Sequence, residues 1–172
     1  QANFCRVEEA LRSLEEFGKI HRPEMAAACK QFRYQVYTLE SQVLGHQRFQ
    51  QMMRAQLYLV TSPTENLTDI VEAALKGGVQ IVQYREKEGN DCDRIAIARQ
   101  LRECCRQYSA LFLVNDRVDL AIAVDADGVH LGQQDLPIAV ARELMGQDRI
   151  IGRSTTNPEE MAKAIAEGAD YI

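Results

Sequence analysis

Two short apolar segments, each followed by polar residues, constrain the fold of this chain more than any other feature. They lie in residues 111–137, which read LFLVNDRVDLAIAVDADGVHLGQQDLP. LFLV leads into Asn115 and Asp116, GVHL leads toward Asp135, and Val118–Val124 between them has room for only about two helical turns. A strand, a short helix and a second strand predict a βαβ unit with parallel strands. Both aspartates then lie just past the carboxyl end of a strand, where α/β proteins place their ligand chemistry.

The same alternation of strand and helix extends from residue 56 to residue 172. The sequence after the first strand is TSPTEN, so neither a dinucleotide-binding glycine loop nor a Walker loop is present. Polar residues instead follow strand after strand, which favours a (β/α)8 barrel over an open doubly wound sheet. We predict strands at 56–60, 79–85, 111–114, 128–131, 149–152 and 169–172, and helices at 67–76, 93–107, 118–124, 138–145 and 158–167, the last capped by Asn157 with Pro158 at its first position.

Residues 1 to about 54 form a separate helical region. Its helical pattern breaks from Gly18 to Pro23. The apolar series from Met25 to Val43 then alternates steps of four and three, as in the seam of a coiled coil. We therefore expect an α-helical hairpin domain over residues 1–54, followed by the barrel over residues 55–172. Two helices bury little surface, so we expect the seam to pack on a third helix, a partner chain or the following domain.

Length and composition limit the possible functions. A (β/α)8 barrel needs about 200 residues or more, so residues 55–172 supply only a partial TIM barrel of about five and a half βα units. We therefore expect the 172 residues to be part of a longer protein. The net charge of −5 predicts no attraction to nucleic acid or anionic membranes, and no apolar run is long enough to span a bilayer. Five cysteines without a C-x-x-C pair predict free thiols in a reducing cytoplasm.

The second strand of the barrel ends in basic residues. Alternate residues of a strand share a face, so Gln83, Arg85 and, if the strand continues, Lys87 point the same way. Arginine binds phosphate through its planar fork and lysine acts as a point charge, so this face suits a phosphate or pyrophosphate. The alternative interpretation is that YREKEG is a solvated charged loop.

Asp116 and Asp135 end consecutive strands, and neighbouring strands lie about 4.8 Å apart. Two carboxylates at that spacing suit Mg²⁺ shared with substrate phosphates. The alternative is that each aspartate caps the helix that follows it. Asn115 could bind a heterocycle or a phosphate oxygen, or close a turn. Ser154, after the fifth strand, could hold pyrophosphate or belong to a capping run.

No Ser-His-Asp or Cys-His arrangement is evident in the sequence, and His130 fits a packed strand residue better than a general base. The residues alone therefore predict a magnesium-assisted reaction on a small molecule that carries a pyrophosphate. Without a protein nucleophile, the site would act by binding the substrate and stabilising the departing pyrophosphate.

Three motifs, in this order and spacing, resemble thiamine phosphate synthase: QYREK (83–87), VNDRVDLAIAVDADGVHLGQQDLP (114–137) and IGRSTTNPEE (151–160). The resemblance covers residues 56–172. The opening QANFCRVEEALRSLEEF also resembles a helical extension found before the synthase domain of some bacterial members. The resemblance implies Mg²⁺-dependent condensation of 4-amino-2-methyl-5-(diphosphooxymethyl)pyrimidine with a thiazole phosphate, giving thiamine phosphate and pyrophosphate.

The resemblance also implies roles for single residues. The segment Gln83, Tyr84, Arg85, Glu86 and Lys87 would hold the pyrimidine diphosphate together with Asn115, and Ser154 would contact the pyrimidine. Asp116 and Asp135 would bind Mg²⁺, while Arg85 and Lys87 stabilise the leaving pyrophosphate. The family's later phosphate-binding segments have no counterpart here, so we expect the 172 residues alone to be inactive.

Two other functions compete with this interpretation. A thiazole tautomerase would share the barrel without the transferase chemistry, but the set of Arg85, Lys87, Asp116 and Asp135 argues against it. A non-catalytic fragment would self-associate through the helical hairpin or through the open edge of the barrel, which would leave strand groups unpaired.

Overall fold

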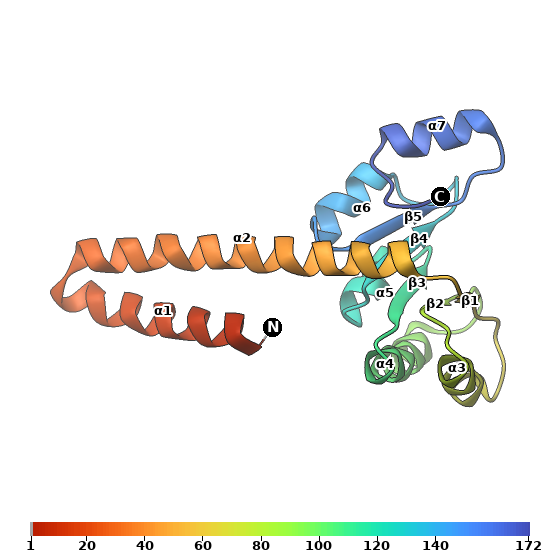
Figure 1. Cartoon of the computed structure of the whole chain (residues 1–172), viewed down its shortest axis with the longest axis horizontal. Helices are drawn as coiled ribbons and strands as arrows, with labels where there is room; N and C mark the ends of the chain where they lie inside the picture. Colours follow the sequence, from red (N-terminus) through yellow and green to blue (C-terminus); the bar gives the residue numbers. More distant parts are fainter. Residues whose placement is uncertain (1) are drawn as a thin grey trace. The chain divides into compact units, whose positions relative to one another are not determined.

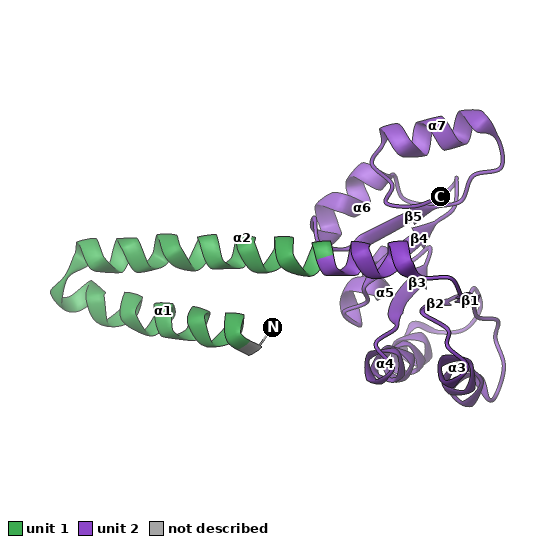
Figure 2. Ribbon diagram, in the orientation of Figure 1, with its two compact units in different colours: residues 1–46 green, residues 47–172 purple. Residues whose placement is uncertain are grey.

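The computed structural model describes residues 2–172, and the chain divides into two compact units, Gln1–His46 and Gln47–Ile172 (Figure 2). Two long helices come first, and an alternation of strands and helices follows (Figure 1). None of the helices in residues 2–172 combines the length and the apolar character needed to cross a membrane.

The first unit contains α1 (Ala2–His21) and most of α2 (Pro23–Arg54), as the helical pattern predicts. The predicted break between Gly18 and Pro23 is present, but it comes at Arg22, because α1 continues through Gly18 to His21. A β-carbon at Gly18 would lie 3.1 Å from the backbone nitrogen of Ala26, so this glycine allows α2 to approach closely instead of ending α1. The two helices are also joined by an ion pair in which the Arg33 guanidinium lies 3.0 Å from the buried carboxylate of Glu15.

The second unit is built on a five-stranded sheet in which every strand is parallel to its neighbours. The strands follow one another in chain order, which confirms the predicted alternation of strand and helix. The strands are β1 (Tyr58–Val60), β2 (Ile81–Tyr84), β3 (Leu111–Asn115), β4 (Gly128–Leu131) and β5 (Ile150–Arg153), and the helices are α3 (Leu67–Lys76), α4 (Asp91–Gln107), α5 (Val118–Ala123), α6 (Ile138–Met145) and α7 (Pro158–Ala166).

Two local predictions meet different outcomes. Asn157 caps α7 as expected, since its side chain accepts a hydrogen bond from the backbone of Glu160, and Pro158 opens the helix. The strand predicted at 169–172 is wrong, because the only bridge there joins Tyr171 to Gly152. Two backbone hydrogen bonds hold this segment beside β5, but they do not extend into the regular pairing of a sixth strand.

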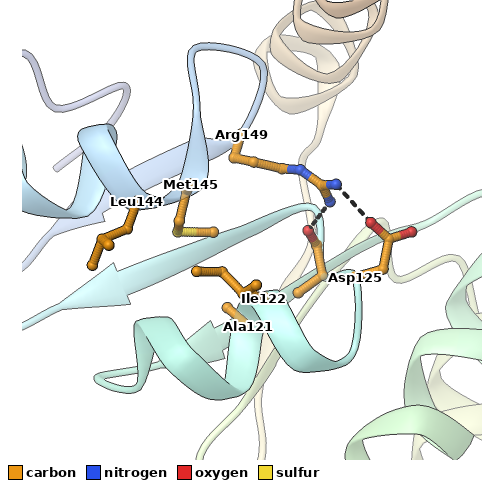
Figure 3. A pocket seen from close by; sticks show the side chains of 7 residues that line it. Ala121, Ile122, Asp125, Leu144, Met145 and Arg149 are labelled. Atoms are coloured by element: carbon orange, nitrogen blue, oxygen red, sulfur yellow. Dashed lines mark hydrogen bonds and ion pairs between the residues drawn. The ribbon is translucent and has the colours of Figure 1, made fainter.

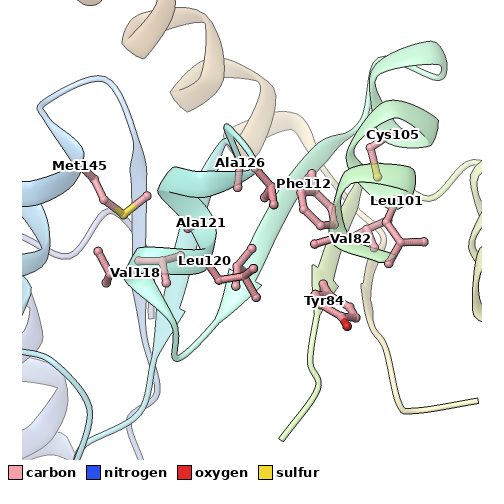
Figure 4. Packing of buried hydrophobic residues seen from close by; sticks show 14 of the residues in the cluster. Val82, Tyr84, Leu101, Cys105, Phe112, Val118, Leu120, Ala121, Ala126 and Met145 are labelled. Carbon is pink, nitrogen blue, oxygen red and sulfur yellow. The ribbon is translucent and has the colours of Figure 1, made fainter. Parts of the chain in front are cut away.

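Buried side chains lie on both faces of the sheet. One face packs against helices α3 to α7, with Val82 and Phe112 in the main hydrophobic core (Figure 4). Val129 of β4 belongs to the same core. Residues of the other parity, including Ile81 and Leu113, form a smaller cluster, which Met52 and Ala55 contact. This pattern places Gln83, Asn115 and His130 on the face turned away from helices α3 to α7, because they alternate with core residues along their strands.

Within the second unit, the end of α2 is held by a charged cluster near the start of the strands. Arg48 Nε lies 3.0 Å from Asp127 Oδ1, and its Nη1 lies 2.9 Å from Asp148 Oδ2. The other oxygen of Asp127 accepts a hydrogen bond from the buried backbone N–H of Phe112 (3.0 Å). One carboxylate thus connects a helix end and a central strand.

Arg48→Met should lower the free energy of unfolding by about 2 kcal/mol, because it leaves the buried carboxylate of Asp127 without a cation and leaves Asp148 with only its longer ion pair to Arg149 (3.6 Å). Equilibrium urea unfolding measures the change. Arg106→Met is the matched control, since Arg106 pairs with Glu103 on the exposed surface of α4, and it should cost less than about 0.5 kcal/mol. Equal effects of the two substitutions would contradict the structural role of Arg48.

Candidate active site

The polar residues singled out in the sequence gather at the carboxyl ends of the parallel strands. Asn115 is the last residue of β3 and Asp116 follows it. Asp135 comes after β4, and Ser154 comes directly after β5. Because all five strands run in the same direction, these ends lie along one edge of the sheet. The order of the strands places β3 next to β4, so the two aspartates belong to neighbouring connections, as predicted.

Neither aspartate caps a helix, so the capping interpretation is wrong. Arg117 is the N-cap of α5, and Pro137 is the N-cap of α6. Asp116 has a positive φ of 62°, and its N–H donates a hydrogen bond to the carbonyl of His130 (2.8 Å). This backbone conformation is uncommon outside glycine, although aspartate adopts it more readily than most residues. The Asp116 carboxyl is therefore available for another role.

The Asp116 carboxyl lies against Asp135. Burial raises the pKa of Asp116, and a hydrogen bond to Asp135 together with its negative charge raises that pKa further. Lys87 opposes these effects, with its Nζ 3.7 Å from Asp116 Oδ2, and so does a hydrogen bond from Asn115. Asp135 Oδ2 also accepts a short hydrogen bond from the backbone N–H of Gly132 (2.6 Å). Two close carboxylates beside one lysine form a site that a further cation would stabilise.

Asp116→Asn should make stability less dependent on pH in the absence of divalent cations. A carboxyl whose pKa is higher in the folded than in the unfolded protein binds more protons when folded, so its ionisation costs stability. The variant should therefore gain stability relative to the parent as the pH rises from 3.8 through the raised pKa, and lose that advantage in acid. Urea unfolding at a series of pH values measures the difference, and a difference that is constant with pH would contradict the prediction.

A second polar group runs across the same face of the sheet as a chain of hydrogen bonds. Gln83 Nε2 lies 2.7 Å from the Tyr58 hydroxyl, which lies 2.7 Å from the hydroxyl of Tyr171. The Tyr171 hydroxyl is 2.9 Å from Nδ1 of His130, and Nε2 of the same ring is 2.8 Å from Ser154 Oγ. Three strands, the bridge residue at 171 and the residue after β5 thus contribute to one continuous path that ends at a predicted site residue.

The structure does not bring every predicted residue to these two groups. Tyr84 is 1% exposed in the core on the helix side, and burial raises the pKa of its phenol. The Glu86 carboxylate accepts a hydrogen bond from the backbone of Glu88 within its own loop. Arg85 is half-buried, and its backbone N–H donates to the hydroxyl of Thr61 after β1 (3.0 Å).

Sequence reasoning did not include Tyr58 and Tyr171 in the site, and it treated His130 as a packed strand residue. The signal that points to Tyr58 and His130 is strand parity, because each lies on the same face as Gln83. Tyr171 carries no such signal, since it lies outside the regular strands and reaches the group only through its bridge to Gly152.

A small cavity of about 100 Å³ lies at the opposite end of the strands, between α5 and α6 (Figure 3). Apolar side chains such as Ile122 and Met145 line it, and Arg149 closes one side by an ion pair with Asp125 (2.6 Å). Its two charged groups neutralise each other, and no predicted site residue reaches it. The carboxyl ends of the strands therefore remain the candidate active site.

Among residues 2–172, no group of three or more histidine, cysteine, aspartate or glutamate side chains could hold a metal ion. A cation bound between Asp116 and Asp135 would thus take its other ligands from water or from a bound substrate. This suits Mg²⁺, which is commonly held by one or two carboxylates plus substrate phosphates.

Comparison with known proteins finds matches for both parts of the chain. The family model described as thiamine monophosphate synthase matches residues 57–172, and that of the ThiD2 family matches residues 1–42. A thiamine-phosphate synthase of Synechocystis sp. is 71% identical over all of this chain and half of its own length, and one of Gloeobacter violaceus is 53% identical with the same coverage. The chain spans about half the length of the curated relatives it matches.

The fold also resembles a solved structure. The thiamine phosphate pyrophosphorylase from Pyrococcus furiosus superposes with a TM-score of 0.63 and is 43% identical. The match covers 68% of this chain and 58% of that protein.

Proposed function

The chain belongs to the thiamine monophosphate synthase family, and on this premise we propose that the whole protein joins 4-amino-2-methyl-5-(diphosphooxymethyl)pyrimidine to a thiazole phosphate. The products are thiamine phosphate and pyrophosphate. The observation that carries the proposal is the placement of Asp116 beside Asp135 and Lys87 at the ends of neighbouring strands. This cluster combines carboxylates for a hard cation with a positive charge for a phosphate.

The proposed chemistry needs no protein nucleophile. The bond between the pyrimidinylmethyl carbon and the diphosphate oxygen breaks, and its electron pair leaves with pyrophosphate. The nitrogen of the thiazole then captures the carbon cation. Arg85 and Lys87 hold the leaving group and stabilise its growing negative charge. Mg²⁺ bound by Asp116 and Asp135 would supply further positive charge at the same place.

The other predicted residues would bind the pyrimidine substrate. Gln83 and Asn115 lie on the sheet face that carries the site, and Ser154 ends the hydrogen-bonded chain there. Glu86 belongs to the loop that carries Lys87. Tyr84 would contribute by fixing β2 from the core side, since its ring is buried among apolar residues.

We further propose that residues 55–172 form part of a (β/α)8 barrel. All strands are parallel and adjacent in chain order, as successive units of such a barrel are. The face that carries Gln83 and His130 would be the inside of the barrel, and the helices would form its outer layer. The thiazole phosphate would then bind to parts of the whole protein other than those described above.

A second proposal concerns residues 1–54, which we infer form a helical hairpin that mediates self-association. Large apolar side chains of the first unit face solvent, among them Phe17 (73% exposed), Ile20 and Phe32. Sedimentation of the 172-residue chain at increasing concentration tests this, and replacement of Phe17 and Phe32 by serine should shift the chain toward the monomer. A monomer at every concentration would contradict the proposal.

The assay for the main proposal uses the whole protein with both substrates, with Mg²⁺ and with EDTA. We expect thiamine phosphate and pyrophosphate in equal amounts with Mg²⁺ and a large loss of turnover with EDTA. Reactions that lack either substrate are the controls. A thiazole tautomerase would instead convert a thiazole substrate without the pyrimidine diphosphate and release no pyrophosphate, and that result would overturn the proposal.

A further inference from the structure

The chain of hydrogen bonds from Gln83 to Ser154 has a direction. The amide nitrogen of Gln83 can only donate, so the Tyr58 oxygen accepts that hydrogen bond. The one proton of the Tyr58 hydroxyl is then free for its other neighbour, the Tyr171 oxygen. Tyr171 in turn has one proton to give, and the nitrogen within reach is Nδ1 of His130. If Tyr171 donated to Tyr58 instead, the Tyr58 oxygen would accept both hydrogen bonds and its own proton would not take part in this series of hydrogen bonds.

This direction fixes the tautomer of His130. A neutral imidazole that accepts at Nδ1 carries its proton on Nε2. That proton points to Ser154 Oγ, 2.8 Å away, so the serine oxygen accepts. The Ser154 hydroxyl is exposed at the end of β5, and its own proton is left to donate to whatever binds there.

Burial keeps the members of the chain in the protonation states that this direction needs. It lowers the pKa of His130, and the negative charge of Asp135 opposes this effect. It raises the pKa of Tyr58 and that of Tyr171, so both phenols keep their protons. The positive charge that would reverse the role of Nδ1 is therefore disfavoured.

A glycine of β5 makes room for the ring of Tyr171. A β-carbon at Gly152 would lie 2.1 Å from Cζ of the Tyr171 ring, so only glycine leaves room for the ring there. The ring also packs edge-to-face on Tyr58 at 6.1 Å and lies 5.4 Å from the His130 ring. Packing against Gly152, Tyr58 and His130 thus holds the Tyr171 hydroxyl next to Nδ1 of His130.

We propose that His130 is a positioning residue that Tyr171 holds as the Nε2–H tautomer. By donating its Nε2–H to Ser154 Oγ, His130 directs the Ser154 hydroxyl proton toward a hydrogen-bond acceptor of the ligand. The proposal rests on the proposed function only for the identity of that ligand. Two acceptors fit the chemistry, a ring nitrogen of a heterocycle and an oxygen of a phosphate. Ser154 thereby becomes a donor whose direction the protein fixes before the ligand arrives.

The tautomer can be measured without any ligand, by ¹⁵N NMR of the histidine-labelled 172-residue chain. We expect a protonated Nε2 and an unprotonated, hydrogen-bonded Nδ1 for His130. Tyr171→Phe should shift the Nδ1 resonance and populate the other tautomer. Tyr108→Phe is the control, since that hydroxyl bonds Glu72 on the outer helices, and it should leave His130 unchanged. A parent chain with Nδ1–H or a charged ring at pH 7 would overturn the proposal.

Binding measurements identify the acceptor. The probes are 4-amino-5-hydroxymethyl-2-methylpyrimidine, which has no phosphate, and inorganic pyrophosphate. Ser154→Ala should weaken binding of the probe that carries the acceptor about tenfold and leave the other unchanged. Tyr171→Phe should weaken binding of the same probe about threefold. The double variant Tyr171→Phe/Ser154→Ala should bind that probe no more weakly than Ser154→Ala alone. The proposal would be contradicted if the two substitutions weakened binding independently of each other, or if Ser154→Ala left the affinity for both probes unchanged.

These results separate the two proposals. A directed chain in the NMR spectrum with no synthase turnover would leave the positioning role standing and reject the proposed reaction. Synthase turnover together with the Nδ1–H tautomer of His130 would support the proposed reaction and reject the positioning role. Should Tyr171→Phe fail to fold, the spectrum of the parent chain and the affinity of Ser154→Ala still decide the question.

Discussion

Asp135→Asn should lower synthase turnover of the whole protein about 100-fold and weaken its dependence on Mg²⁺. The amide keeps an oxygen that can accept the hydrogen bond from Gly132, so the turn after β4 is preserved while the negative charge is lost. A bound cation supplies several kcal/mol of stabilisation to a leaving group, and 100-fold corresponds to about 3 kcal/mol. Steady-state assays over a range of Mg²⁺ concentrations measure both effects.

Asp69→Asn is the matched control for this variant. It makes the same chemical change at an exposed residue in the first turn of α3, which is not one of the predicted site residues, and should leave turnover and Mg²⁺ dependence unaltered. Unfolding curves for both variants confirm that differences in activity do not come from lost stability. Normal Mg²⁺ dependence in Asp135→Asn would rule out the assignment of the metal site.

Gly128→Ala should reduce the free energy of unfolding by about 3 kcal/mol. Gly128 opens β4, and a β-carbon there would lie 2.1 Å from the carbonyl oxygen of Ile150 in β5. Backbone atoms cannot turn aside as a flexible side chain can, so the two strands must separate where they pair. Urea unfolding monitored by circular dichroism measures the loss.

Gly77→Ala tests whether the effect belongs to this position. Gly77 has a φ of −77°, which alanine adopts without strain, and the nearest atom to an added β-carbon is 3.3 Å away. We expect a change smaller than about 1 kcal/mol. A comparable loss in both variants would show that contact with Ile150 is not the cause.

Much of the second unit could be predicted because its signals are local. Short apolar runs, glycine after helices and N-caps depend on residues close in the chain, and the predicted bounds of α3, β4 and α6 agree with the structure. The errors arose where a distant contact decides. The break predicted to begin at Gly18 begins only after His21, because the close approach of Gly18 to Ala26 cannot be seen in a local pattern.

The candidate site shows the same division. Asp116 and Asp135 could be paired in advance, because parallel strands in chain order bring successive strand ends together. The link from Tyr58 to Tyr171 spans more than a hundred residues and depends on a single bridge to Gly152, so no spacing in the sequence indicates it. His130 was judged by its apolar neighbours in GVHLG, whereas its function depends on what lies across the sheet.

The strand order has a consequence for how the protein is made. Each strand pairs with the one synthesised just before it, so every addition to the sheet needs only a preformed edge and one helix to cover it. Contacts of short sequence separation form quickly, and domains are built from their amino end during synthesis. The second unit can therefore assemble one βα step at a time as it leaves the ribosome. Tyr58 and Gln83 would be in place on the sheet before His130 emerges.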